Sequence, residues 1–146
     1  MPIRLAIASD HGGFELKEHL LAWLAGRDDI AVADLGTRDE AAVDYPDLAH
    51  PLAEAVARGD FDRGILVCGT GIGMSIAANR HRGIRAALCT DPYMARMSRE
   101  HNDANVLCLG GRVLGRSLAE DIVRAFLDGE FGGERHARRL AKLDPR

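Results

Sequence analysis

Residues 64–79, GILVCGTGIGMSIAAN, form the stretch that decides the fold. Its first part, Gly64–Cys68, is an apolar and β-compatible run, which predicts a buried strand. The glycine-rich loop 69–73 then predicts a tight turn, and Gly73–Asn79 has the composition of a helix. A strand that leads through a short turn into a helix is typical of α/β proteins with a parallel sheet.

The same alternation of an apolar run and a helix-like segment recurs on both sides of this stretch. Five strand–helix units in succession favour a parallel sheet covered by helices on both faces. The predicted pairs are Ile3–Ala8 with Gly13–Gly26, Ile30–Leu35 with Asp47–Arg58, Gly64–Cys68 with Gly73–Asn79, Ile84–Cys89 with Pro92–Glu100, and Asn105–Leu109 with Leu118–Leu127.

Two segments fall outside these units. Residues 36–47 form the one sizeable irregular loop, because they are rich in charged and turn-forming residues. Residues 134–143 are charged and compatible with a helix, and they follow the glycine-containing break 128–133. Since this C-terminal helix carries few apolar anchors, we expect the tail 134–146 to pack on a partner subunit.

Composition narrows the class of protein. The chain has 146 residues, of which 47% are hydrophobic, and this predicts one domain over residues 1–146. A net charge of −3 and a pI of about 6.0 argue against binding to nucleic acid or a membrane surface through bulk positive charge. No apolar run approaches the ~20 residues of a membrane span, and Met1–Arg4 leads into a strand rather than a signal peptide, so we expect a cytoplasmic protein.

Cysteine and histidine spacing gives no sign of a disulfide framework or a metal centre. The three cysteines, at 68, 89 and 108, are odd in number and widely spaced. No metal is assigned, because the remaining histidines lack the spacing of metal ligands. These histidines are His19, His50, His81 and His136.

The loop 69–73 carries the clearest chemical signal. In open parallel sheets, ligands bind outside the carboxyl ends of the strands, and three glycines there can point successive N–H groups at an anion. Neither a nucleotide P-loop nor a dinucleotide motif fits, because no Gly-Lys-Ser/Thr follows and Met74 replaces the last glycine of GxGxxG. The N–H groups of this loop could therefore stabilise an oxyanion that develops during a reaction.

Cys68 lies directly before the loop, where we expect the backbone N–H dipoles to favour a thiolate. Cys68 is therefore a candidate base. A cysteine at the end of a strand is otherwise an inert core residue, and we favour that structural role for Cys89 and Cys108, which lack a glycine loop.

Other candidates occur in pairs with two possible roles. Asp10 and His11 follow the first strand at the same edge, and they could handle substrate, or Asp10 could cap a helix beside a solvated His11. His101 and Asn102 could act on a ring oxygen and an enediolate, or they could end a helix and form a turn.

Three arginines could bind a phosphate. Arg112 follows the fifth strand, and Arg135 and Arg139 lie one helical turn apart, so the three could close on one anion. The alternative is that each is a solvated surface charge, as most of the 17 arginines of this chain should be.

Several of these motifs together resemble one family. The segments SDHGGF (9–14), DYP (44–46), CGTGIGMSIAAN (68–79), REHNDANVL (99–107) and GGRV (110–113) resemble, in order and spacing, the ribose-5-phosphate isomerase B family. Its superfamily also includes galactose-6-phosphate and allose-6-phosphate isomerases. The resemblance implies a three-layer Rossmann-like domain without a metal or organic cofactor. It also implies a homodimer or dimer of dimers, with active sites between subunits.

The resemblance also implies roles for individual residues. Some family members use a glutamate at the position of Met74, so this sequence is of the cysteine type. By position, the resemblance implies that Cys68 is the base, with Thr70 nearby, and that the enediolate is held by the amides of Gly69, Gly71, Ile72 and Gly73. Ring opening would be assisted by Asp10 and His101, and the sugar hydroxyls would be contacted by Tyr45 and Asn102. The phosphate would be bound by His11, Arg112, Arg135 and Arg139.

The expected activity is aldose–ketose isomerisation of ribose 5-phosphate and ribulose 5-phosphate through an enediolate. The same chemistry on allose 6-phosphate, galactose 6-phosphate or a tetrose phosphate is the first alternative. A non-catalytic nucleotide-binding α/β domain is a more distant one. A thiol phosphatase is disfavoured, because no basic residue follows Cys68 until Arg80.

Overall fold

A five-stranded parallel sheet forms the centre of the protein in a computed structural model that describes residues 1–145. The strands pair in the order β2-β1-β3-β5-β4, and all four pairings are parallel. Their bounds are β1 Ile3–Ser9, β2 Ile30–Asp34, β3 Arg63–Cys68, β4 Ala86–Leu88 and β5 Val106–Gly110.

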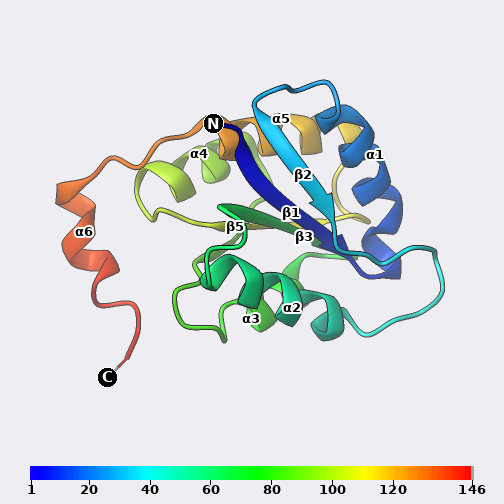
Figure 1. Cartoon of the computed structure of the whole chain (residues 1–146), viewed down its shortest axis with the longest axis horizontal. Coiled ribbons are helices and arrows are strands. Elements are labelled where there is room, and N and C mark those ends of the chain that lie inside the picture. The colour runs from blue at the N-terminus through cyan, green and yellow to red at the C-terminus, as the bar shows by residue number, and fades with distance from the viewer. Residues whose placement is uncertain (146) are drawn as a thin grey trace.

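Helices cover both faces of this sheet (Figure 1). Helices α1, α4 and α5 lie on one face, and α2 and α3 lie on the other. The predicted three-layer α/β architecture is therefore confirmed. The bounds are η1 His11–Gly13 (a 3-10 turn), α1 Phe14–Leu24, α2 Tyr45–Ala57, α3 Ile72–Ala78, α4 Pro92–Glu100, α5 Arg116–Asp128 and α6 Glu134–Leu140.

Two apolar cores result from the alternation of side chains along the strands. Leu5 and Ile7 of β1 point into a core that contains Phe126 of α5. Ala6 of β1 points the other way, into a core that contains Leu52 of α2. Because both faces are covered, the central strands are continuous apolar runs, and this is why they could be recognised in the sequence.

Two predicted boundaries moved for identifiable reasons. Helix α2 begins at Tyr45 instead of Asp47, because Pro46 lies in the first turn, where its missing N–H costs no helical hydrogen bond. Strand β4 is limited to Ala86–Leu88 instead of 84–89. The N–H of Ile84 donates to the carbonyl oxygen of His81 at 3.1 Å and that of Arg85 to Oδ1 of Asn105 at 2.8 Å, so the residues before Ala86 bond to a turn and to a side chain rather than to a strand.

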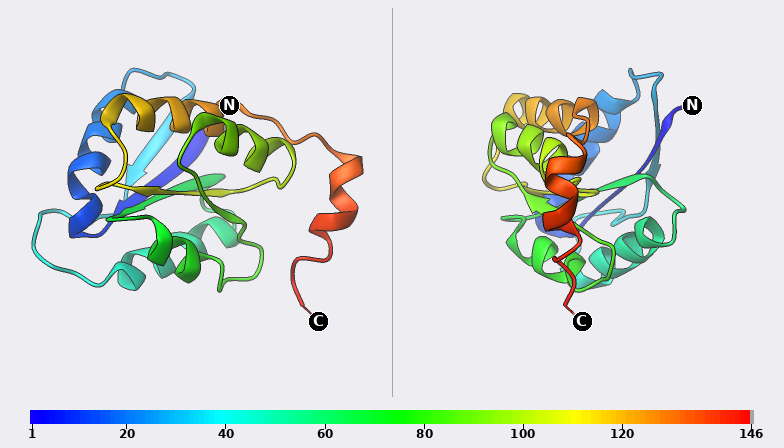
Figure 2. Two further views of the ribbon diagram at one scale, coloured as in Figure 1. Left: turned by 180° about the vertical axis from the view of Figure 1, so that it is seen from behind. Right: turned by 90° about the vertical axis from the view of Figure 1, so that its left-hand side faces the viewer.

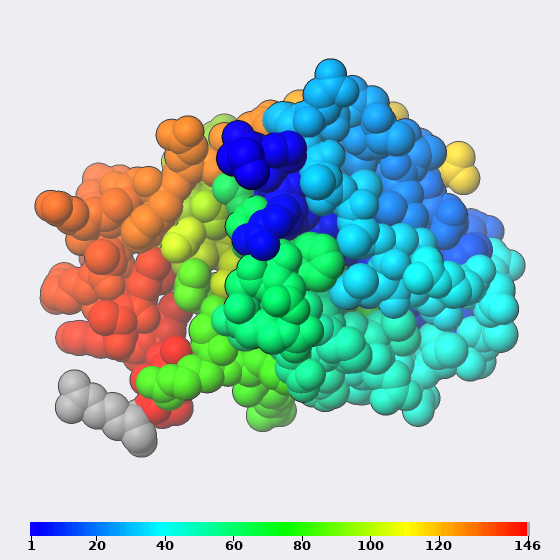
Figure 3. All heavy atoms as spheres, in the orientation of Figure 1, coloured from blue at the N-terminus to red at the C-terminus, as the bar shows by residue number. Residues whose placement is uncertain are grey.

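Helix α6 stands apart from the sheet (Figure 2). It spans Glu134–Leu140 of the predicted helix 134–143 and is reached through the extended segment 129–133. In the space-filling view, the C-terminal segment lies along one side of the molecule (Figure 3). Its packing on a partner subunit stays a prediction. Within residues 1–145, no helix has the length and apolar character needed to cross a bilayer.

Substitution of Gly13 tests the closest contact in the fold. A Cβ atom on Gly13 would overlap the carbonyl oxygen of Val67, so we expect Gly13→Ala to lower the free energy of unfolding by about 1–3 kcal/mol. Chemical denaturation would measure this. Gly26→Ala is the control, because its Cβ would meet only the Trp23 carbonyl oxygen at 3.6 Å. Equal stability of the two variants would contradict the packing described.

Candidate active site

The strand order reverses between β1 and β3, which makes this the switch point of the sheet. From β1 the chain passes to β2 on one side, whereas β3 pairs with β1 on the other side. Loops at the carboxyl ends of two such strands diverge and leave a crevice for a ligand. Asp10 and His11 follow β1 and Cys68 ends β3, so these three residues share the edge on which the sequence analysis placed them.

The backbones of three loops touch at this edge. The N–H of Gly111, after β5, donates to the carbonyl oxygen of Cys68 at 2.7 Å, and the N–H of Arg112 donates to that of Gly69 at 3.0 Å. A Cβ on Gly111 would lie 2.8 Å from the carbonyl oxygen of Gly12, after β1. The glycines are therefore needed for the loops to meet.

The Cys68 thiol is buried and accepts a hydrogen bond. Gly71, with φ of 82°, turns its N–H back toward the chain and donates to Sγ of Cys68 at 3.1 Å. This left-handed conformation favours glycine, and a Cβ there would lie 2.6 Å from Cδ1 of Leu88. The glycine loop thus points an N–H at the sulfur, as an anion-binding loop should.

The other two cysteines differ from Cys68 in their surroundings. Burial, followed by the charge of Asp91, raises the pKa of the Cys89 thiol to about 11. Burial also raises the pKa of Cys108. Both groups therefore stay protonated near neutral pH, which agrees with the structural role favoured for them.

Tyr45 covers the glycine loop from the start of α2. A Cβ on Gly73 would lie 2.6 Å from Cε1 of Tyr45, so the ring packs directly on this glycine. Within the loop, Oγ1 of Thr70 accepts a hydrogen bond from the N–H of Ile72 at 3.2 Å. Tyr45, Thr70 and Ile72 thus all lie at the glycine loop that follows Cys68.

A cavity of about 340 Å³ lies next to this loop and contains two of the predicted phosphate ligands. The guanidinium of Arg112 lies over the bare backbone of Gly69, where a Cβ would be 3.4 Å from Nη1. Nδ1 of His11 accepts a hydrogen bond from the N–H of Val43 at 3.2 Å. The lining residues are His11, Gly12, Glu15, Leu16, Glu40, Gly111 and Arg112.

A second group of predicted site residues lies at the opposite edge of the sheet. His101 and Asn102 follow α4, which runs back from the carboxyl end of β4 toward the amino end of β5. Arg135 and Arg139 belong to α6, beyond that same end. Within one chain, Arg112 is therefore not brought together with Arg135 and Arg139, and the single clamp expected from the sequence does not form there.

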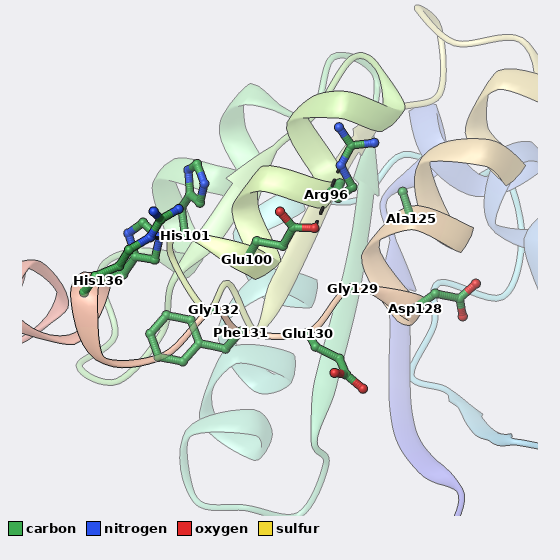
Figure 4. Close-up of a pocket in the computed structure, with 11 residues that line it drawn as sticks. Arg96, Glu100, His101, Ala125, Asp128, Gly129, Glu130, Phe131, Gly132 and His136 are labelled. Atoms are coloured by element: carbon green, nitrogen blue, oxygen red, sulfur yellow. Dashed lines mark hydrogen bonds and ion pairs between the residues drawn. The ribbon is translucent and has the colours of Figure 1, made fainter.

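Two residues of this second group, His101 and Arg135, border a cavity of about 650 Å³ (Figure 4). His101, Arg135 and His136 line it together with residues of α4 and of the segment leading to α6. The rings of His101 and His136 stack with their centroids 4.5 Å apart. No role for His136 is predicted from the sequence, because the stacking joins residues 35 positions apart and leaves no local sequence signal.

Comparison with known proteins identifies the family. A sequence model of a family described as Ribose/Galactose Isomerase matches residues 5–143. The chain belongs to the ribose/galactose isomerase family. It is 49% identical to ribose-5-phosphate isomerase B of Escherichia coli, over 96% of this chain and 93% of that protein.

Further relatives of this isomerase agree in sequence and in structure. The solved structure of Clostridium thermocellum ribose-5-phosphate isomerase B is 55% identical, with a TM-score of 0.94 over 97% of this chain and 95% of that one. A D-erythrulose-4-phosphate isomerase of Pectobacterium atrosepticum is 42% identical over 97% of this chain and 93% of that protein. The chain is thus a sugar-phosphate isomerase of the aldose–ketose type, with the Rossmann-like fold of its relatives.

An ion pair between a buried lysine and a partly buried aspartate anchors the loop that reaches the edge of the sheet with the candidate site. Nζ of the fully buried Lys17 lies 2.9 Å from Oδ1 of Asp34, which also accepts the N–H of Gly36 at 2.9 Å. Burial opposes ionisation of Asp34, but the hydrogen bonds from Gly36 and Lys17 outweigh it and hold the pKa of the carboxyl below its usual range. The start of the loop that carries Val43 to His11 is thereby fixed.

The side chains of residues 1–145 include no group of three or more His, Cys, Asp or Glu arranged to hold a metal ion.

The hydrogen bond from Val43 predicts the tautomer of His11. Because Nδ1 accepts, neutral His11 should carry its proton on Nε2, which leaves an N–H to donate into the cavity. Long-range ¹H–¹⁵N spectra of the labelled protein would distinguish the two ring nitrogens. Val43→Pro, which removes the donor, should shift the signals toward a mixture of tautomers. A wild-type His11 protonated on Nδ1 would contradict the geometry.

Proposed function

We propose that this isomerase interconverts ribose 5-phosphate and ribulose 5-phosphate through an enediolate, with Cys68 as the base. The observation that carries the proposal is the position of Cys68. Its sulfur lies at the switch point of the sheet and accepts the N–H of Gly71, at the start of a loop of backbone donors. The relatives named ribose-5-phosphate isomerase B support the pentose phosphate as substrate.

In the proposed reaction, the Cys68 thiolate removes the proton from carbon 2 of the open-chain aldose. The electron pair of that bond forms the double bond to carbon 1, and the carbonyl oxygen becomes an enediolate oxygen. Backbone N–H groups of Gly69 and Gly73 would hold this oxygen, joined by those of Gly71 and Ile72 when these release the Cys68 sulfur and Oγ1 of Thr70, and each such donor is typically worth about 3–4 kcal/mol in the transition state. A proton passes from the oxygen on carbon 2 to the oxygen on carbon 1, and return of the proton from the Cys68 thiol to carbon 1 then leaves the carbonyl at carbon 2 and regenerates the thiolate.

The remaining groups open the sugar ring and bind its ends. We assign ring opening to Asp10 and His101, and contacts with sugar hydroxyls to Tyr45 and Asn102. One phosphate would be bound by two sets of groups together. His11 and Arg112 line the cavity beside the glycine loop, and Arg135 and Arg139 lie on α6. Phosphate is well matched by the planar guanidinium of arginine.

A complete site of this kind requires a second copy of the chain. The carboxyl edge of one subunit, with Cys68, would meet the amino edge of the other, with His101 and α6. Exposed apolar side chains on α3 and α4 support such a contact, because large apolar groups in solvent mark interaction surfaces. These side chains are Ile72, Ile76, Tyr93 and Met94.

A tetrose phosphate is the second candidate substrate, because one relative is a D-erythrulose-4-phosphate isomerase. Glu40, from the loop between β2 and α2, borders the cavity with His11 and Arg112, so this loop would set the length of sugar accepted. A coupled assay across tetrose, pentose and hexose phosphates decides between them. We expect the highest kcat/KM with ribose 5-phosphate, and a preference for the tetrose phosphate would overturn that choice.

Cys68→Ala tests the base. We expect kcat to fall by on the order of 10³-fold or more, with ribose 5-phosphate still bound, because the variant loses proton transfer but no binding group. Steady-state kinetics and calorimetric titration would measure the two quantities. Cys89→Ala is the control, since that buried thiol lies outside the site, and its kcat should be unchanged. Near-normal turnover by the Cys68 variant would exclude this mechanism.

Mixing two inactive variants tests whether the site is shared. In a homodimer of the Cys68→Ala variant, and likewise in one of the His101→Asn variant, both active sites lack a required residue. In a randomly exchanged mixture, half of the dimers are hybrids with one intact site of two, so about a quarter of wild-type activity should return. The assay is activity after unfolding and co-refolding of equal amounts. No recovery, with hybrids verified by mass spectrometry, would show that both residues act in the same chain.

A further inference from the structure

His136 is the one buried residue within α6, and it is buried against a proposed acid–base group. Its side chain is 8% exposed, and its ring stacks on that of His101 with an interplanar angle of 29° (Figure 4). Phe131 lies on the approach to α6, with its ring centroid 6.4 Å from that of His136. The contact between α6 and the end of α4 is thus centred on these two imidazoles.

The Nε2 edge of the His136 ring also makes a hydrogen bond. Nε of Arg135 donates a hydrogen bond to Nε2 of His136 at 3.1 Å. A neutral imidazole that accepts at Nε2 carries its proton on Nδ1, and protonation of Nε2 would abolish the bond. Burial, followed by the nearby positive charges of His101, Arg135 and Arg139, lowers the pKa of His136. Both the hydrogen bond from Arg135 and the lowered pKa favour the neutral form of His136 as an acceptor.

We propose that His136 is a positioning residue of the isomerase, which presents the His101 imidazole and the Arg135 guanidinium as one rigid unit. This inference rests on the proposed function, in which His101 assists ring opening and Arg135 binds phosphate. The stacked face of His136 fixes the plane of the His101 ring, and its Nε2 fixes the orientation of the Arg135 guanidinium group. The distance between acid–base group and phosphate ligand is then set before substrate arrives, which favours catalysis.

The backbone around the cavity holds the unit in place. The N–H of Gly132 donates to the carbonyl oxygen of Glu100 at 2.8 Å, and this ties the segment before α6 to the last turn of α4. A Cβ on Gly132 would lie 3.0 Å from that oxygen and 3.5 Å from Cδ2 of His136, so the segment can lie close under the ring. The other ionisable groups that border this cavity are Arg96, Glu100, Asp128 and Glu130.

Two substitutions separate the two contacts of His136. His136→Phe keeps an aromatic ring for stacking but has no acceptor for Arg135, so KM should rise about tenfold with kcat nearly unchanged. His136→Gln keeps an acceptor but loses the ring, so kcat should fall about tenfold, and the limb of the pH–rate profile that reports His101 should shift. Steady-state kinetics across pH would measure both.

The control is His50→Gln. His50 is a half-buried histidine on α2 whose Nδ1 lies 2.7 Å from Nε2 of His81, outside both groups of site residues. Its kinetic constants should match the wild type. Wild-type constants in both folded His136 variants would overturn the inference, and so would equal losses of kcat and kcat/KM in both, because that pattern would indicate only a poorly docked α6.

A spectroscopic measurement needs no variant. The ¹⁵N signals of the His136 ring should show a neutral, Nδ1-protonated tautomer throughout the pH range of activity. A His136 that is protonated within that range would overturn the inference, because it could not accept from Arg135. If the wild type turns over no sugar phosphate at all, the proposed function fails, and this inference fails with it. If the wild type is active but the His136 variants or the His136 spectra give one of the contrary results above, only the role of His136 is refuted and the proposed function stands.

Discussion

Contact between bare backbones at the carboxyl ends of β1, β3 and β5 determines the rest of this structure. Gly13 touches the carbonyl of Val67, Gly111 touches that of Gly12, and the N–H of Gly111 donates to the carbonyl oxygen of Cys68 at 2.7 Å. Side chains at these glycines would force the three loops apart. Because the loops meet, the sulfur of Cys68 and the His11 cavity lie at one edge, beside the N–H groups that can hold an enediolate.

The same topology places the two groups of candidate site residues at opposite edges of the sheet. Helices return the chain from the carboxyl ends of the strands to their amino ends, so His101 and α6 face away from the thiol. A parallel sheet of this size cannot join both groups within one subunit. Association of two copies in the proposed manner would place the rigid unit of His101, His136 and Arg135 against the glycine loop, and the site would exist only in the assembly.

Local patterns in the sequence were enough to predict the five strand–helix units, because strands buried on both faces are continuous apolar runs and Gly64–Cys68 runs straight into its glycine loop. The edge strand β4 was predicted too long, since the N–H groups of Ile84 and Arg85 bond to a turn carbonyl and to the Asn105 side chain. Asp10, His11 and Cys68 were placed together by the rule for strand ends. The separation of Arg112 from Arg135, and the stacking on His136, depend on distant contacts that no local pattern encodes.

Proton transfer through an enediolate is the central chemical claim, and isotope exchange tests it most directly. Ribose 5-phosphate would be equilibrated with the enzyme in D₂O, and the recovered sugars examined by NMR. A proton carried by Cys68 can exchange with solvent, so we expect deuterium at carbon 2 of the aldose and carbon 1 of the ketose. Full equilibration of the two sugars with no deuterium at either carbon would contradict it, because the hydrogen would then move directly between carbons without a base.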